Sequence, residues 1–509
     1  MDSKQAPADI VTEEWEGTPL GVREWVYAML GVLESAQEQL LQQKEVIGQL
    51  QKRVSELEEQ VRQNSSNSSK PPSSDGPGQK PATKKTPSGR KAGGQPGHTG
   101  QGRKLRPEAE VSHFVDRRPT SCSGCGALLL GEDPSPMRHQ VTEIPRIEPV
   151  ITEYRCHSLT CLQCGQANQA EWPTEMASGA FGPRLSATVG YLTGRMGMSQ
   201  RDVEEIATSL FHTEISLGSI STLTQEVSQA LATPVLTVQE YVQTQPIVNA
   251  DETGWQQAGQ RHWLWLAATP LVTLFLLTSS RSANSAKALL GEKFAGIVGS
   301  DRWSAYNWLS TTRRQLCWAH LKRDFQAFVE RDDESALLGR ALLAQEKQLF
   351  ALWHRVRDGT LSRDAFITSV QPIQDQVGKL LRQGTSLPHS KTAGTCRDIL
   401  KREDALWTFV TFPGVEPTNN AAERPLRRAV LWRRRSFGTQ SDAGSRFVER
   451  ILTSVTTLRQ QDRDVLDYLT EACAASIRGV TPPSLLPSSL STHLNGYELG
   501  WLSSWVGAK

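Results

Sequence analysis

The chain has 509 residues, 38% of them hydrophobic and 22% charged, and a formal net charge of +2. This length exceeds one ordinary domain and predicts roughly three or four, while the hydrophobic fraction is sufficient for buried cores. The first thirty residues contain several acids and no apolar core, so we expect no secretory signal and a cytoplasmic protein. The eight cysteines do not suggest a disulfide framework, because four of them form two CxxC pairs and the rest are scattered.

The N-terminal region, residues 1–63, carries a seven-residue hydrophobic repeat that starts at Leu33. This repeat predicts a coiled coil of about four heptads, and therefore a homo-oligomer, with β-branched residues that suit a parallel dimer. Polar Gln43 would help to fix the register of the two helices. The alternative is a single amphipathic helix that packs on the protein's own core. The two seam positions hold Leu33, Leu40, Ile47, Val54 and Val61, and Ala36, Gln43, Leu50, Leu57 and Asn64.

Residues 64–107 are rich in Ser, Pro, Gly and Lys and are too polar to bury a core, so we expect a flexible basic linker. Residues 64–106 contain nine Lys and Arg residues against a single acid, Asp75. A linker of this kind either only solubilises the protein or also binds DNA phosphates without sequence preference.

Two matching Cys-x-x-Cys-Gly segments lie in the domain expected at residues 108–180. Such a pair of segments is typical of a tetrahedral Zn²⁺ site, and the glycine after the second cysteine lets backbone amides face the thiolates. Cys156 and His157 lie nearby, and either could replace one ligand. The zinc would stabilise a small domain, and contact with DNA is a further step. The predicted ligands are Cys122, Cys125, Cys161 and Cys164.

Residues 181–240 are expected to form a helical, DNA-binding-like domain. Ser199 is a candidate N-cap for a helix that runs through Val203 and Leu210, and residues 216–219 precede another helix. The spacing of these helices is similar to that of a helix-turn-helix. Because helix pairs are common in proteins, simple packing is the alternative to reading DNA.

A mixed catalytic domain is expected at residues 241–460, with a helical insertion at about 331–405, followed by a C-terminal helical region and tail at 461–509. The apolar stretch 263–278 is short and is broken by Pro270, so two buried strands joined by a turn fit it better than a membrane span. Strands are expected at residues 246–250, 262–268, 271–278 and 296–300, with a helix at 283–290 before the last of them.

Three acids of this domain, Asp251, Asp301 and Glu423, are candidate catalytic residues. Asp251 and Asp301 each follow an apolar run that predicts a strand ending at a functional edge. Glu423 lies in the first turns of a helix that Asn419 or Asn420 can cap. Mg²⁺ and Mn²⁺ prefer oxygen ligands, and two such ions can hold the attacking and leaving oxygens of a phosphoryl transfer. The three acids are therefore also the predicted ligands of Mg²⁺ or Mn²⁺.

Each of these acids also has an ordinary interpretation, because most of the 54 acidic residues must be solvated surface charges. Glu423 could pair with Arg427 at helical spacing. Glu449 is a competing third acid, although it belongs to a helix of mixed charge. Three tryptophans near the acidic motifs either stack on an unpaired base or, more simply, pack in the core. These are Trp255, Trp303 and Trp318.

Basic residues follow Glu423 at high density. Guanidinium groups bind phosphate through two parallel hydrogen bonds, so this cluster predicts a polyanionic substrate, with a solvated helix face as the alternative. A shorter basic pair lies in the segment CWAHLKRDF, where Cys317 and His320 could form half of a metal site, although no second pair follows. The candidate DNA-binding residues are Arg424, Arg427, Arg428, Arg433, Arg434, Arg435, Lys322 and Arg323.

Six stretches resemble the insertion-sequence-66 family of DDE transposases, in order from about residue 33 to about residue 475. Carried over by position, the family's catalytic acids fall on Asp251, Asp301 and Glu423. The resemblance implies a multidomain α+β protein with a ribonuclease-H-like core that contains a helical insertion. This core would follow the coiled coil, the basic linker, the zinc-binding domain and the helical region. The stretches are NSSNSSKPPSSDG (64–76), GGQPGHTG (93–100), ADETGW (250–255), SDRWSAY (300–306), LCWAHLKRDF (316–325) and NNAAERPLR (419–427).

The resemblance implies a bacterial, nucleoid-associated transposase whose partner is DNA. It would bind the terminal inverted repeats of its own element, cut a strand to expose a 3′ hydroxyl and join that hydroxyl to target DNA. Mg²⁺ or Mn²⁺ would act at the acids and Zn²⁺ at the cysteines. Small accessory proteins of the same element would be further partners. No membrane is expected to be involved. Two alternatives are a metal-dependent nuclease that cuts without joining and a non-catalytic, zinc-containing coiled-coil DNA-binding regulator.

Overall fold

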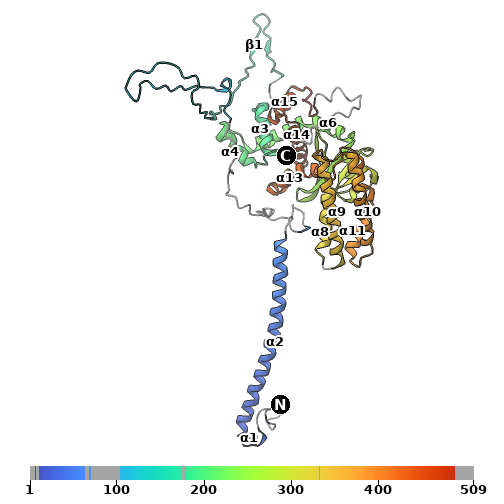
Figure 1. Cartoon of the computed structure of the whole chain (residues 1–509). Coiled ribbons are helices and arrows are strands. Elements are labelled where there is room, and N and C mark those ends of the chain that lie inside the picture. The colour runs from blue at the N-terminus through green and yellow to red at the C-terminus, as the bar shows by residue number, and fades with distance from the viewer. Residues whose placement is uncertain are drawn as a thin grey trace. The chain divides into compact units, whose positions relative to one another are not determined.

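The computed structural model describes residues 6, 11–63, 68–69, 104–174, 176, 179–331 and 333–487, and combines helices with two β-sheets (Figure 1). The protein is thus a mixed α+β protein. Most of the expected basic linker and the last residues of the tail lie outside the described residues. The chain falls into two compact units, one comprising Met1–Thr83, His320–Phe350 and Asp375–Arg397, the other Lys84–Ala319, Ala351–Gln374 and Asp398–Lys509.

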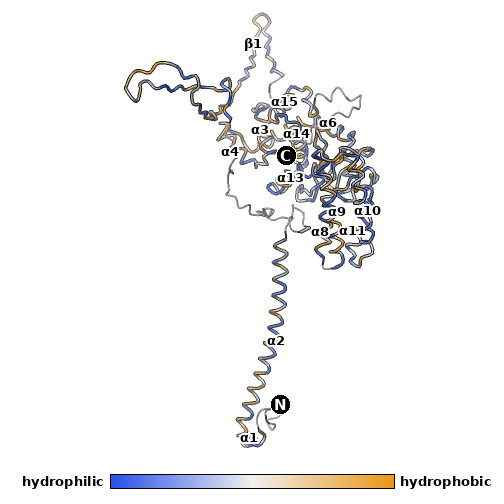
Figure 2. The backbone as a smooth tube through the Cα atoms, in the orientation of Figure 1, coloured by the Kyte–Doolittle hydropathy of each residue, from blue (hydrophilic) through white to orange (hydrophobic). Residues whose placement is uncertain are grey.

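The first unit begins with the short helix α1 (Thr12–Glu16) and the 43-residue helix α2 (Leu20–Arg62). Trp15 of α1 is buried, with its ring centroid 5.6 Å from that of Tyr27 in α2. Hydrophobic residues recur along the otherwise hydrophilic α2 (Figure 2). A continuous helix therefore spans the predicted heptads as far as Arg62.

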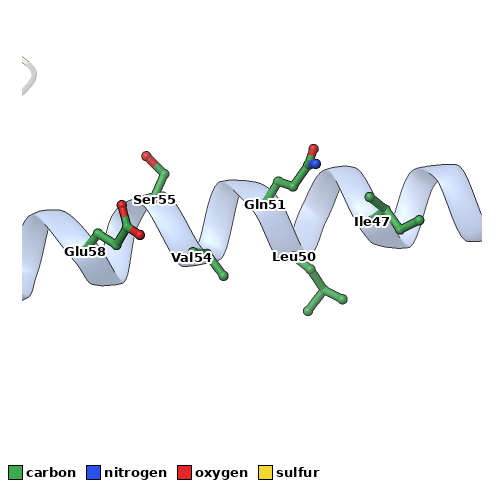
Figure 3. Close-up of a pocket in the computed structure, with 6 residues that line it drawn as sticks. All are labelled: Ile47, Leu50, Gln51, Val54, Ser55 and Glu58. Atoms are coloured by element: carbon green, nitrogen blue, oxygen red, sulfur yellow. The ribbon is translucent and has the colours of Figure 1, made fainter.

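The hydrophobic side chains of the predicted seam are exposed along α2. Their exposed fractions range from 43% at Leu57 to 75% at Val61. Leu50 and Val54 point to one side of the helix, whereas Gln51 and Ser55 point to the other (Figure 3). The coiled coil itself stays a prediction.

The expected helical insertion consists of α9 (Glu334–Arg357), α10 (Arg363–Gly384) and α11 (Ser390–Leu400), and α8 (Trp318–Val329) precedes it. Glycines allow close packing within the first unit. A Cβ atom added at Gly339 would lie 2.7 Å from the carbonyl oxygen of Phe325, and one added at Gly384 would lie 2.5 Å from the Cys396 sulfur. These contacts leave no room for a larger residue at either position.

The second unit contains a five-stranded sheet in the order β5-β4-β3-β6-β7. Strands β3, β4 and β5 pair antiparallel, β6 pairs parallel with β3, and β7 pairs parallel with β6. Helix α7 (Ala283–Leu290) lies between β5 and β6 in the chain. The strands are β3 (Ile247–Gln257), β4 (Gln260–Ala268), β5 (Thr273–Thr278), β6 (Ile297–Ser300) and β7 (Arg314–Leu316).

Two sequence-based expectations about this sheet are wrong. Asp251 does not end a strand, because β3 continues to Gln257 and returns as β4 through Ala258 and Gly259. Both turn residues have positive φ, 50° and 75°, which suits a tight hairpin that keeps the strands paired to their ends. The second error is β7, a strand that was not expected.

The apolar stretch at residues 263–278 forms the paired strands β4 and β5, as expected. Within the described part of the chain, no helix is long and apolar enough to cross a membrane.

Helices cover both faces of the sheet, and alternate residues of β4 enter different cores. Leu264 and Leu266 pack with residues of α13 (Asn420–Ser436), whereas Trp265 and Ala267 belong to a core that includes α7. Helix α14 (Asp442–Gln460) contributes to both cores.

The second unit contains further helices, and their bounds are α3 (Pro183–Gly194), α4 (Gln200–Phe211), α5 (Leu217–Ala230), α6 (Ala232–Gln243) and α15 (Val465–Arg478). Ser199 caps α4, as expected, and Ser216 caps α5, which begins at Leu217 and so includes most of the residues expected to precede it. Val227 and Val238 belong to the same core as the sheet residues Val248 and Ala250. Helices α5 and α6 therefore share a core with the sheet, whereas Val203 and Ala207 of α4 belong to a separate cluster with Ile220 of α5.

Candidate active site

Asp251 and Asp301 are brought together by the parallel pairing of β3 with β6. Asn249 pairs with Gly299; Asp251 lies two residues after Asn249, and Asp301 lies two residues after Gly299. Parallel neighbours advance in step, so the two aspartates lie at the same level of the sheet. Asp251 is within β3, whereas Asp301 comes directly after the last residue of β6.

Glu423 reaches this level of the sheet from the first turn of α13. Asn419 occupies the N-cap position, but its side chain does not cap the helix. Its Nδ2 donates instead to the carbonyl oxygen of Ala250 at 2.8 Å, and its backbone N–H donates to Cys317 Sγ at 3.1 Å. Cys317 Sγ is within 4.8 Å of a carboxylate oxygen of Glu423. The start of α13 is thereby held beside β3.

The charges of the other two predicted acids act on Asp251. The pKa of Asp251 is raised well above its usual value, first by burial and then by the charges of Glu252, Asp301 and Glu423. Gathering carboxylates in a buried place is unfavourable for the fold and is a frequent property of functional sites. The arrangement leaves negative charge that a cation could neutralise.

A fourth carboxylate, Glu252, was missed by the sequence reasoning; it follows Asp251 in β3 and points to the opposite face of the sheet, and its charge helps to raise the pKa of Asp251. Its side chain is fully buried, and its oxygens accept hydrogen bonds from Arg281 Nε at 2.8 Å and from the Tyr306 hydroxyl at 2.9 Å. Burial, followed by the charge of Asp301, raises the pKa of Glu252, while Arg281 lowers it. Its position next to Asp251 in the sequence was the available signal.

Trp303 is the exposed member of the three tryptophans near the acids. It is 36% exposed, whereas Trp255 and Trp318 are buried in the core. Its backbone N–H donates to Asp301 Oδ1 at 2.8 Å, and its indole N–H donates to the carbonyl oxygen of Arg281 at 3.1 Å. Trp303 therefore borders the acidic cluster.

The predicted DNA-binding arginines divide into exposed and structural side chains. Arg433 is half-buried and donates to the carbonyl oxygen of Gly254 and, at 3.1 Å, to Thr253 Oγ1, so it fastens α13 to β3. Arg435 donates to the carbonyl oxygen of Met196 at 3.4 Å while remaining exposed. The other exposed arginines of α13 are Arg424, Arg427, Arg428 and Arg434.

The two basic residues of α8 also differ in their surroundings. The Lys322 ammonium lies 3.2 Å from Glu346 Oε1, which is nearly buried, and Arg323 is half-buried.

Three arginines, Arg195, Arg428 and Arg459, form a group of neighbouring positive charges that the sequence did not predict. Burial, followed by the charges of Arg428 and Arg459, lowers the pKa of Arg195. These arginines come from α13, α14 and the end of α3, so only the fold brings them together. Repulsion among them would be relieved by a bound anion.

Glu449, the competing third acid, forms a hydrogen bond to the edge strand β5. It is buried, and one carboxylate oxygen accepts a hydrogen bond from the backbone N–H of Leu277 in β5 at 2.6 Å. Thr453 and Thr457, one and two turns later in α14, accept from the N–H groups of Phe275 and Thr273 at 2.9 and 3.1 Å. Burial raises the pKa of Glu449.

The predicted zinc ligands lie in two turns of identical geometry. In the first turn the N–H of Cys122 donates to Ala127 and its carbonyl accepts from Gly126, both at 2.8 Å, and Cys161 makes the same bonds with Gln166 and Gly165. The two glycines have φ of 78° and 74°, in the left-handed region.

Backbone N–H groups face the first sulfur of each turn. Hydrogen bonds from Cys125 and Gly124 lower the pKa of the Cys122 thiol, and those from Cys164 and Gln163 lower that of Cys161. The turns thus favour thiolates, which are the metal-binding form of cysteine. Across residues 104–174, however, no three of these cysteines have sulfur atoms within 4.8 Å of one another. The Cys156 thiol donates to the carbonyl oxygen of Glu171.

Comparison with known proteins places the chain among transposases. Residues 178–446, more than half of the chain, match the model of the transposase IS66 family, and residues 32–104 match a family of unknown function (DUF6444). The uncharacterized protein y4qI of Sinorhizobium fredii is 26% identical over 246 residues, 43% of this chain and 44% of that protein. The uncharacterized protein y4hP of the same species is 24% identical over 406 residues, 72% of each chain. The chain belongs to the IS66 family of transposases.

Proposed function

We propose that the protein is a DDE transposase that binds the ends of its own element, cuts DNA to expose a 3′ hydroxyl, and joins that hydroxyl to target DNA. Membership of the IS66 family implies transposition, with DNA as the partner. The observation that carries the mechanism is the convergence of Asp251, Asp301 and Glu423 from β3, the end of β6 and α13.

The same three acids would hold Mg²⁺ or Mn²⁺. Their donor set fits these ions because carboxylate oxygens are hard ligands, and the charge repulsion that, together with burial, raises the pKa of Asp251 would fall when cations bind. The bound ions would supply Lewis acidity to the phosphoryl transfer. The protein's own residues orient this centre through the Asn419 side chain and through the Trp303 N–H on Asp301.

The connectivity of the sheet supports a ribonuclease-H-like catalytic domain. Three antiparallel strands are followed by two parallel ones, and the spatial order 3-2-1-4-5 puts the first strand, which carries Asp251, beside the fourth, which Asp301 follows. Helices α9, α10 and α11 separate the last strand from α13 and form the insertion. The exposed arginines of α13 would bind the DNA backbone next to the acids.

Residues 108–180 would form a small zinc-binding domain, with one Zn²⁺ held by the cysteines of the two turns. The matched turns and the lowered thiol pKa values of Cys122 and Cys161 support this assignment. Metal analysis of purified protein should find about one zinc per chain. Zinc that stays at the same level in a Cys161→Ser, Cys164→Ser double variant would exclude these ligands.

The mechanism is tested with labelled DNA carrying the element's ends. Asp251→Asn, Asp301→Asn and Glu423→Gln should each abolish cleavage and joining and leave end binding intact, because ligands of one metal centre act as a unit. Activity should require Mg²⁺ or Mn²⁺, whereas Ca²⁺ should support binding only. Glu449→Gln is the matched control and should remain active.

Three other outcomes would change the assignment. Cleavage without joining by the parent protein would indicate a nuclease. Binding without cleavage by the parent under every metal condition would indicate a DNA-binding regulator. If Glu449→Gln were inactive and Glu423→Gln active, the third acid would be Glu449.

A further inference from the structure

Arg281, at the edge of the acidic cluster, is held on three sides. Its guanidinium carbon lies 3.9 Å from the ring centroid of Trp303 and 4.8 Å from that of Trp263. Its Nε and Nη2 atoms lie 2.8 and 2.6 Å from the same oxygen of the buried Glu252 carboxylate. An arginine between two indoles and a carboxylate has little rotational freedom, so its position is fixed by the fold.

Both oxygens of the Glu252 carboxylate are engaged by this arrangement. Oε1 accepts from Arg281, and Oε2 accepts from the Tyr306 hydroxyl at 2.9 Å. Tyr306 is itself buried, with its ring centroid 6.1 Å from that of Trp265. Glu252 therefore serves as a fixed anchor for Arg281.

The other edge of the guanidinium remains available. Among the residues that the structure describes, none hydrogen-bonds to Nη1 of Arg281, and the side chain is 27% exposed. Nη2 lies 4.0 Å from Asp301 Oδ2, beyond hydrogen-bond distance but beside the acid. One side of the guanidinium is thus anchored, while the other presents N–H donors next to the acidic cluster.

We propose that Arg281 is a phosphate-binding catalytic residue whose Nη1 edge hydrogen-bonds a non-bridging oxygen of the phosphodiester undergoing reaction at the acids. The inference rests on the proposed function and extends it by a residue outside the three acids. A guanidinium fork matches two phosphate oxygens, and a donor fixed before the substrate arrives stabilises the developing charge without reorganising. Glu252 and Tyr306 are positioning residues in this scheme.

The test compares single-turnover cleavage of two duplexes that carry the element's end. One has a normal phosphodiester at the cut position, and the other has a neutral methylphosphonate there. On the normal duplex, Arg281→Gln should lower the rate about a hundredfold, as expected for loss of a fixed donor to a charged transition state. Arg281→Lys, which keeps the charge and loses the fork, should fall between Arg281→Gln and the parent.

On the methylphosphonate duplex, Arg281→Gln should cleave nearly as fast as the parent protein, because the neutral group offers the arginine no charged oxygen to bind. A structural defect would instead slow both duplexes in the same proportion, and that result would overturn the proposal. A rate defect that excess Mg²⁺ restores would also overturn it, because Arg281 would then act only in the charge balance of the metal centre.

Arg261→Gln is the matched control, since Arg261 lies 4.7 Å from the Trp263 ring centroid and is exposed on the strand. Its rate should match that of the parent on both duplexes. If Arg281→Gln does not fold, Glu252→Gln provides a second variant, because it keeps the shape of the anchor and weakens its hold on Arg281. It should give a smaller loss of rate that likewise shrinks on the methylphosphonate duplex, and an equal loss on both duplexes would overturn the proposal.

Asp251→Asn separates failure of this inference from failure of the proposed function. If Asp251→Asn cleaves like the parent, the acid-centred mechanism is wrong and the role of Arg281 falls with it. If Asp251→Asn is inactive and Arg281→Gln cleaves like the parent, the mechanism stands and only the phosphate contact of Arg281 is refuted.

Discussion

The side-chain amide of Asn419 donates to the backbone carbonyl oxygen of Ala250 at 2.8 Å, joining the residue before α13 to the residue before Asp251. Asn419 is completely buried and lies four residues before Glu423. Its Oδ1 has no hydrogen-bond partner among the described residues. One side-chain hydrogen bond therefore links the strand that carries Asp251 to the helix that carries Glu423.

Asn419→Asp should disturb both stability and activity, because it removes the donor and adds a buried negative charge. Loss of a buried partner typically costs about 1–3 kcal/mol, and more when a charge is involved. Thermal unfolding and end cleavage provide the measurements. Asn420→Asp at the exposed neighbour is the control and should stay within about 0.5 kcal/mol of the parent. Equal effects at the two positions would mean that the link to Ala250 is unimportant.

Asp251→Asn should stabilise the metal-free protein at neutral pH. The parent carries a buried carboxylate that is repelled by Glu252, Asp301 and Glu423, and the amide removes that repulsion while keeping an acceptor for the Glu252 N–H. Melting in a chelator should show a higher Tm for the variant. Added Mg²⁺ should raise the Tm of the parent more than that of the variant, since ligand binding stabilises the folded state. A lower Tm for the variant in chelator would contradict this electrostatic picture.

Glu449→Gln should change how stability depends on pH. Because burial raises the folded-state pKa of Glu449 above its usual 4.5, its contribution to stability is fully present below 4.5 and is lost as pH rises through the folded-state pKa. Glutamine does not titrate and can still accept from the Leu277 N–H. The variant should therefore gain stability relative to the parent as pH increases. Denaturant unfolding from acid to neutral pH measures this difference, and a constant difference would refute it.

The arginines of α13 should differ in their effect on the salt dependence of DNA binding. Replacing exposed Arg424, Arg427 and Arg428 with alanine should reduce the slope of log affinity against log salt by roughly one for each phosphate that is no longer bound. Arg433→Ala should mainly lower stability, since this side chain bonds to Gly254 and Thr253. Binding titrations at several salt concentrations test both statements. An unchanged slope in the triple variant would place these arginines away from DNA.

The exposed seam of α2 should bind a second copy of the chain. Leu50→Asp should convert an oligomer into a monomer in sedimentation at concentrations on the order of micromolar, because it puts a charge into the helix interface. Ser55→Asp is the control and should leave the oligomer intact, because Ser55 lies outside the two seam positions and points away from Leu50 and Val54 (Figure 3). A monomeric parent chain would remove this assignment.

Local signals in the sequence predicted many elements of the second unit. The helix expected at residues 283–290 is found at Ala283–Leu290, and Ser199 caps its helix as expected. The strand before Asp301 also lies where its apolar run predicts. Apolar runs and capping residues act on their near neighbours, so they can be read without knowledge of the fold.

Features set by distant contacts could not be read in this way. The polar residues after Val248 suggest a loop, yet pairing with β4 keeps them in a strand. Strand β7 contains Arg314 and Gln315, both buried, and has no hydrophobic pattern. Arg314 donates to the carbonyl oxygen of Asp301 at 3.0 Å, and burial lowers its pKa to about 10. The different roles of Arg433 and Arg428 likewise depend on which residues the fold brings near them.

The hydrogen bonds from β5 to Glu449, Thr453 and Thr457 make α14 a substitute for a missing neighbouring strand. Four residues of an α-helix advance about 6 Å, and two residues of a strand advance about 6.6 Å, so the spacing of the three acceptors matches that of the three N–H groups. An open strand edge invites other chains to pair and aggregate, and here side chains block that edge. Removing a single residue between Glu449 and Thr453 would rotate the later acceptors by about 100° and reopen the edge. This part of α14 should therefore tolerate substitutions that keep an acceptor far better than it tolerates any change in length.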